Sequence, residues 1–213
     1  ADNETMALFS QNGACSFYYD DAVKASTASG GFTVSGTCTA TAFAGDGSAL
    51  TGLSAGVSSD AQYNTVGGTN AGDSFTGTDA ENNTLFGYDA GTAITTGDLN
   101  IGIGSGALKA VTTASQNIAI GWEALKTITT TGNHVAVGTG ALRNLDGGFA
   151  NTGVGHYAGT ALTGGGFNAL FGLEAGTALT SGSQNTALGA YSLHTNTTSA
   201  GNTALGYSTL RYQ

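Results

Sequence analysis

The sequence predicts an all-β fold: a short β-shaft over residues 1–63, then a parallel β-solenoid, or β-roll, of about nine coils over residues 64–213. Three observations predict it. A pentapeptide ending in glycine recurs every 17 residues, the chain holds 36 glycines with only 9% charged residues, and no run keeps a helical period without a Gly or Thr-Thr interruption. This period is shorter than the roughly 33 to 50 residues of a helix pair or a propeller blade, and it fits one solenoid coil.

The repeat continues through most of the chain without a slip. An imperfect first copy, Asn64–Gly68, ends 19 residues before the closing glycine of the first strict copy. At about 3.3 Å per residue, a coil has a perimeter below roughly 56 Å, so its interior is one side chain thick. The closing glycines of the strict copies are Gly87, Gly104, Gly121, Gly138, Gly155, Gly172, Gly189 and Gly206.

Each coil position has its own requirement. Position one is Asn in every strict copy except His134, which suits a turn whose side chains bond the backbone and stack as a ladder between coils. Position five is the glycine, required where φ is positive or the backbone packs closely. Position eight is always small, with Ser192 and Thr209 replacing the usual Ala.

Two positions are predicted to form the core. Position four is always large and apolar, so we expect it to line the interior of the coil. Position twelve is apolar in six copies and predicts a second, opposing core strand, but it is polar at Asn196 and Gln213. The position-four residues are Phe86, Ile103, Ile120, Val137, Val154, Phe171, Leu188 and Leu205, and the apolar position-twelve residues are Ile94, Val111, Ile128, Leu145, Leu162 and Leu179.

Position three predicts an oligomer. Side chains of a strand alternate between its faces, and position three is never polar, so the strand is apolar or small on both. One face lines the interior of the coil, and the other face, being apolar or small too, must also be shielded from water. A neighbouring copy of the chain is the simplest cover, so we expect an obligate homo-oligomer. The position-three residues are Leu85, Gly102, Ala119, Ala136, Gly153, Leu170, Ala187 and Ala204.

The segment before the coils follows other rules. Two β-rich runs flank Gln11-Asn12-Gly13, which is a hairpin signal, and Asp20-Asp21 predicts a second turn. Strands this short cannot build a monomeric core, so they too need partner chains. The expected strands are 4–9, 15–19, 31–34 and 37–43.

Two sets of motifs resemble known fibres. The runs Gly30–Thr37 and Phe43–Leu53 resemble the shaft of tail-fibre proteins of tailed bacteriophages. The coils, clearest at Asn185–Gly189 and Asn202–Gly206, resemble phage fibres and the head repeats of trimeric autotransporter adhesins. The matches cover most of the chain after its first 29 residues.

This resemblance implies a homotrimer whose shaft interleaves three chains and whose coils form three β-rolls side by side. It implies a virion tail fibre exposed to the extracellular medium, attached to other tail or baseplate proteins and binding a host surface glycan or protein receptor. Such fibres often end in an intramolecular chaperone that is cut off. Since the sequence stops at Gln213, inside a coil, we expect a C-terminal part that was removed or lies outside this chain.

Charge and composition limit which binding partners the sequence predicts. The net charge of −9 repels phosphate backbones, so nucleic acid is not expected as a partner. The sequence has no stretch of about 18 or more apolar residues, so no membrane insertion is predicted. The first residues lack the layout of a signal peptide. Cys15 and Cys38 lie in strand-like runs and are interpreted as small buried thiols, with a disulfide as the alternative.

The sequence predicts no enzyme, cofactor or metal site. His134, His156 and His194 fall at positions one, six and ten, so they do not converge and are expected at the surface or in turns. A glycosidase-type carboxylate pair across a trimer interface stays open as an alternative. An acidic group near the first coil could bind Ca²⁺, although a solvated loop is favoured; it comprises Asp73, Asp79, Glu81 and Asp89.

Two surface stripes are candidate binding features. Four of the five basic residues occupy position ten and could contact an anionic glycan. A solubilising edge is the favoured interpretation, with Glu123 offsetting some like-charge repulsion. Aromatic residues at positions six and seven suit stacking on sugar rings or, equally, packing against a neighbouring chain. The basic stripe is Lys109, Lys126, Arg143 and Arg211, with His194 in the same place, and the aromatic stripe is Tyr88, Trp122, His156, Tyr157, Tyr191 and Tyr207.

The leading functional hypothesis is a structural and adhesive virion fibre that attaches to the host surface by multivalent glycan binding. A tailspike-like depolymerase is one alternative, but no strict coil carries an insertion that could build a catalytic groove. A bacterial surface adhesin or filament subunit is another. An ice-binding solenoid is the most distant, suggested by the ladder of Thr95, Thr112, Thr129, Thr163 and Thr180.

Overall fold

The computed structural model describes residues 7–9, 14–19, 22–28, 31–37, 57–75 and 79–212. The chain divides into two compact units, residues 1–50 and residues 51–213. Every regular element in these described ranges is a β-strand and none is a helix, which confirms the all-β prediction.

The first unit is an antiparallel sheet of four strands in sequence order: β1 (Ala7–Phe9), β2 (Cys15–Tyr19), β3 (Ala22–Ala28) and β4 (Gly31–Val34). β1 pairs with β2 and confirms the predicted hairpin, and β4 matches its predicted range. β3 was not predicted, and the strand expected at 37–43 lies outside the described residues except for Thr37. Large side chains stay exposed, Phe9 by 75% and Phe32 by 60%, so this sheet covers little apolar surface within one chain.

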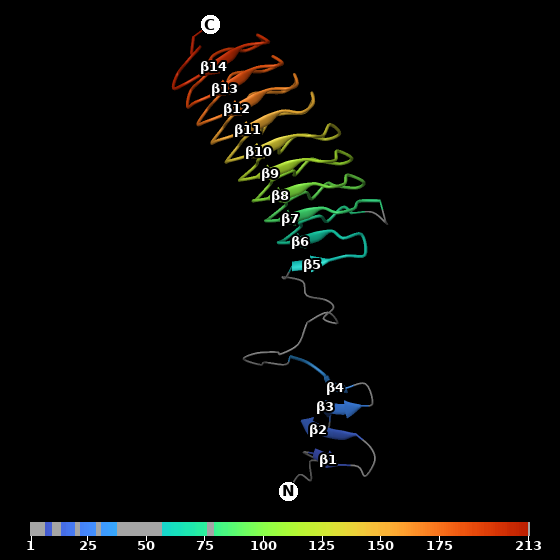
Figure 1. The fold of residues 1–213 in the computed structure, drawn as a ribbon. Helices are drawn as coiled ribbons and strands as arrows, with labels where there is room; N and C mark the ends of the chain where they lie inside the picture. Colours follow the sequence, from blue (N-terminus) through green and yellow to red (C-terminus); the bar gives the residue numbers. More distant parts are fainter. Residues whose placement is uncertain are drawn as a thin grey trace. The chain divides into compact units, whose positions relative to one another are not determined.

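The second unit is a β-solenoid. Its sheet holds β5 (Val57–Ser59), β6 (Thr65–Gly67), β7 (Thr84–Phe86), β8 (Ile101–Ile103), β9 (Ile118–Ile120), β10 (Val135–Val137), β11 (Thr152–Val154), β12 (Ala169–Phe171), β13 (Thr186–Leu188) and β14 (Thr203–Leu205). Figure 1 shows the coils stacked in chain order from β6 to β14.

Neighbouring coils are in strict register. Each strand covers positions two to four, and from β7 onward each residue pairs with the one 17 positions later in the parallel ladder, as Ile101 does with Ile118. β5 differs, because it pairs antiparallel with β6 at the first edge of the sheet. The sequence placed residues up to 63 in the shaft, whereas β5 belongs to the solenoid sheet and the two units divide between Leu50 and Thr51.

The position-five glycine is needed for both predicted reasons, a positive φ and close packing of the backbone. Gly121 has φ of +138°, and a Cβ there would lie 2.5 Å from the carbonyl oxygen of Gly138 in the next coil. An L-side chain would be strained and would also separate the two coils.

The asparagines form the predicted ladder. Oδ1 of Asn100 accepts hydrogen bonds from both the backbone N–H (3.0 Å) and the side-chain amide (3.1 Å) of Asn117. The amide of Asn100 also donates to the carbonyl of Ala114 at 2.9 Å, which ties the two ends of its own coil together. These side chains are buried, so the ladder satisfies polar groups that would otherwise destabilise the interior.

The structure reverses the predicted faces of the strand. Position three points into the coil, where Leu85 and Ala119 are fully buried, while position four faces outward, with Ile103 40% and Leu205 69% exposed. The prediction that position four lines the interior is therefore wrong. Alternation determines which side chains share a face but not which face is inside.

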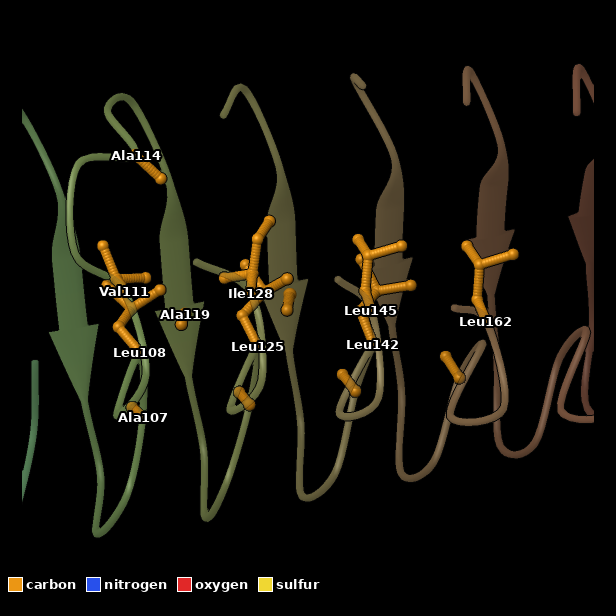
Figure 2. Packing of buried hydrophobic residues seen from close by; sticks show 14 of the residues in the cluster. Ala107, Leu108, Val111, Ala114, Ala119, Leu125, Ile128, Leu142, Leu145 and Leu162 are labelled. Atoms are coloured by element: carbon orange, nitrogen blue, oxygen red, sulfur yellow. The ribbon is translucent and has the colours of Figure 1, made fainter. Parts of the chain in front are cut away.

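The rest of the interior matches the prediction in composition. The apolar position-twelve residues and the position-eight alanines of the strict coils are fully buried. Figure 2 shows Val111, Ile128, Leu145 and Leu162 repeating from coil to coil along the interior. Position twelve, however, lies outside the assigned strands, so the expected second core strand is an irregular return segment.

Positions three and nine fill the core together: in most coils, a large side chain at one position accompanies a small residue at the other. Where position three is Leu85, position nine is Gly91, and a Cβ on Gly91 would lie 2.7 Å from both methyl groups of Leu85. One coil has Gly at both positions, and there a Cβ on Gly159 would lie 2.7 Å from Leu142 and from Leu170 of the two neighbouring coils. A core one side chain thick thus keeps its packing density through paired size changes.

Candidate functional site

The outward side chains of coil positions two and four form a surface that we call the strand face. It follows β7 to β14, and its position-four residues are large and apolar in every coil. Ile120, Phe171 and Leu188 are exposed by 38%, 38% and 49%. An apolar stripe of this length is unusual for a protein surface and is typical of an interaction site.

The basic stripe lies beside carboxylates of position seven. Lys109 bonds Asp89 of the preceding coil at 2.8 Å, and Lys126 bonds Glu123 at 2.7 Å. Arg143, which lies in the following coil, forms an ion pair with the same Glu123. The hydrogen bond between Lys109 and Asp89 lowers the pKa of Asp89 below its usual value and raises that of Lys109.

His194 extends this pattern, since its Nε2 lies 3.1 Å from Glu174 of the preceding coil. Sequence reasoning recognised Glu123 but missed Asp89 and Glu174 as partners. The available signal was an acid at position seven of one coil followed by a base at position ten of the next. Because Lys109, Lys126 and Arg143 each pair with a carboxylate within the chain, the geometry there favours a solubilising edge over an anionic-glycan site.

The aromatic stripe adjoins the basic one. The Arg143 guanidinium lies 5.2 Å from the ring centre of Trp122, and that of Arg211 lies 5.5 Å from Tyr191. Tyr191 also meets the ring of Tyr207 edge-on at 5.9 Å. The structure therefore brings Tyr191, Tyr207 and Arg211 together in the last coils, apart from Trp122 and Arg143.

Other members of the aromatic stripe differ in exposure. Tyr88 and His156 are exposed, whereas Tyr157 is half-buried and touches His156 edge-on at 4.2 Å. Trp122 remains 44% exposed beside Arg143. Tyr88, Trp122, His156 and Tyr207 thus keep ring surface accessible in a single chain.

His134 is fully buried, so a surface position is wrong for it; it occupies position one of its coil, among the ladder asparagines. Its Nδ1 accepts the backbone N–H of Asn151 at 3.2 Å, so the ring proton lies on Nε2, 3.5 Å from Thr131 Oγ1. Burial lowers the pKa of His134 to about 4, because the charged ring would be poorly solvated. His134 thus acts as a neutral member of the ladder.

The acidic group near the first coil does not assemble. Asp73, Asp79 and Glu81 are exposed, and Asp89 is taken up by Lys109 and by Asn70. Within the described residues, no three His, Cys, Asp or Glu side chains gather as a metal site. Cys15 is half-buried in β2, and Cys38 lies outside the described residues.

The threonine ladder has an internal role. The hydroxyls of Thr112, Thr163 and Thr180 each donate to the backbone carbonyl one coil further on, at 3.1, 3.3 and 2.9 Å. These groups hold coils together, which leaves the ice-binding alternative without support from their geometry.

Comparison of the chain with family models, curated proteins and solved structures gives no match. The described part of the chain contains no helix that could cross a membrane.

Proposed function

We propose that the chain is the structural and adhesive part of a homotrimeric fibre, a bacteriophage tail fibre that attaches the virion to glycans on the host surface. The observation that carries the proposal is the strand face, an apolar stripe whose position-four side chains are at least partly exposed in every strict coil of one chain. The resemblance of the shaft and coil motifs to such fibres supplies the trimeric state, the virion location and the attachment to tail or baseplate proteins.

A second copy of the chain suits this stripe better than an unrelated partner. A cover must be apolar over the same length and must repeat with the spacing of the coils, about 4.8 Å. An identical solenoid running in parallel has both properties, so each coil meets its counterpart at one level. The exposed Phe9 and Phe32 of the first unit present the same need for a cover.

Glycan contact is proposed for the accessible rings of the aromatic stripe. Tyr88, Trp122 and Tyr207 each keep a large exposed fraction, and flat aromatic faces suit the apolar face of a sugar ring. Three copies per fibre would raise the avidity of weak single contacts.

Sedimentation equilibrium of the full chain tests the assembly, and we expect three subunits. A glycan array probed with the assembled protein tests adhesion, with Trp122→Ala as the variant and Thr130→Ala, at an exposed position away from the ring, as the control. A stable monomer contradicts the fibre, unchanged binding of Trp122→Ala contradicts the aromatic contact, and cleavage of a bound glycan favours the depolymerase.

A further inference from the structure

One corner of the solenoid departs from the repeat in two consecutive coils. Positions fourteen to seventeen read Gly147-Gly148-Phe149-Ala150 in one coil and Gly164-Gly165-Gly166-Phe167 in the next. No other strict coil has an aromatic residue in this stretch. Two adjacent exceptions suggest a local function, because the other strict coils that reach this stretch fold without an aromatic residue here.

The two phenylalanine rings lie on adjacent coils and are largely exposed. Phe149 is 55% and Phe167 is 66% exposed, and the Phe167 N–H donates to the Phe149 carbonyl at 2.9 Å. Exposing a ring of this size forfeits the stabilisation that its burial would give, so the fold gains little from either. We call these two exposed rings, at the corner that precedes the Asn ladder, the platform.

The glycines at position fourteen leave the surface of the same two coils clear, close in sequence to these rings. A Cβ on Gly164 would meet nothing within 4 Å, and a Cβ on Gly147 would make only an ordinary 3.5 Å contact. Neither residue has a left-handed φ, unlike Gly148 and Gly165 at +77°. Because the other strict coils carry Thr or Ser here, the backbone does not require glycine, and its effect is to leave the surface clear.

A carboxylate stands at the same corner. Position thirteen is Thr in the other strict coils that reach it, but it is the exposed Asp146 in the coil of Phe149. One oxygen of Asp146 accepts the Thr129 hydroxyl at 3.2 Å. An ionised carboxylate offers about four acceptor sites, so Asp146 can also accept hydroxyl groups of a ligand.

We propose that Asp146, Phe149 and Phe167 form a binding site for neutral pyranose sugars. The rings offer π-faces to the slightly positive C–H face of the sugar, the open surface over Gly147 and Gly164 admits it, and Asp146 accepts its hydroxyls. A neutral sugar is favoured because Asp146 is the charged group of the site and the chain carries −9 overall. The site rests on the proposed adhesive function and specifies a ligand class for it.

The test is isothermal titration calorimetry of the full chain with four probes: maltohexaose, cellohexaose, N-acetylchitohexaose and an anionic alginate hexamer. We expect at least one neutral hexaose to bind and the alginate to bind at least tenfold more weakly. Phe149→Ala/Phe167→Ala and Gly164→Thr should each weaken that binding at least tenfold. Leu99→Ala, which removes an exposed apolar side chain from position seventeen of another coil, is the matched control and should bind as the wild type does.

Circular dichroism and sedimentation accompany each variant. Gly164→Thr adds a side chain that other coils already carry, so it should keep the fold while obstructing the platform. Unchanged binding in the double phenylalanine variant, preference for alginate, or no binding of any neutral probe would each overturn the site. A loss of self-association in that variant, without a change in sugar affinity, would assign the corner to a chain contact and also overturn it. A monomer that still binds sugar through these rings contradicts only the trimer.

Discussion

His134 is a single substitution in a ladder of amides, and its neighbours show what it replaces. Asn117 Oδ1 accepts the backbone N–H of His134 at 3.2 Å, and His134 Nδ1 in turn accepts the N–H of Asn151. The imidazole therefore reproduces the acceptor role of asparagine. It lacks the amide that elsewhere donates to the Oδ1 of the preceding coil, so side-chain bonding along the ladder is interrupted here.

His134→Asn should make stability less dependent on pH. His134 binds a proton at about pH 4 when folded and at about pH 6.5 when unfolded, so the free energy of unfolding falls as the pH drops from 6.5 to 4. This loss amounts to about 3 kcal/mol at most, and the substitution should abolish it. Denaturant unfolding between pH 4 and 7.5 measures the difference, with the exposed His156→Asn as the control. An equal pH slope in wild type and His134→Asn would contradict this role.

Gly121→Ala tests the closing glycine of a central coil. Its φ of +138° and the 2.5 Å approach of the Gly138 oxygen leave no place for a methyl group, so we expect a loss of at least about 3 kcal/mol of stability. Gly164→Ala, where a Cβ meets open space, should change stability by less than about 1 kcal/mol. Thermal unfolding of both variants checks the contrast, and equal losses would contradict it.

At the scale of the coil, the repeat predicts the period, the ladder, the small position eight and the apolar position twelve. It could not decide which face of the strand is inside, because a three-residue strand with apolar residues on both faces satisfies either arrangement. The signal that decides it lies at positions three and nine. One coil has Leu85 and Gly91 there, whereas another has Ala119 and Leu125. Two positions that trade bulk must share one space, so both lie in the interior.

A double substitution tests this shared space. Leu85→Ala alone should leave a cavity and cost about 2 to 5 kcal/mol, and Gly91→Leu alone should clash with the Leu85 methyl groups. Together they install the combination found at Ala119 and Leu125, where the leucine backbone has a φ of 48°. Denaturant unfolding should show the double variant to be more stable than either single one. Additive losses would mean that the two sites do not share a space.

At the scale of the whole molecule, the candidate surfaces were only partly predictable. The sequence located the basic and aromatic stripes, but the ion pairs of Asp89 and Glu174 depend on the offset between coils, which one coil does not reveal. The sequence predicted that the outer face of the strand is shielded from water, but it assigned that face to the position-three side chains. In the structure the position-four side chains form it. An oligomer joined through this face would therefore have a more apolar contact surface than the sequence indicated.

The decisive substitution lies on that face. Ile120→Asp puts a carboxylate at the centre of the strand face, where it is solvated in a lone chain but would be desolvated in each subunit of a trimer, at a cost of several kcal/mol per copy. Since position four is outside the coil, the solenoid itself should stay folded, and sedimentation should show a monomer with an unchanged β-type circular dichroism spectrum. Thr130→Asp adds the same charge at an exposed position of the return segment and should remain assembled. An Ile120→Asp protein that still sediments as three subunits would show that the strand face does not hold the chains together.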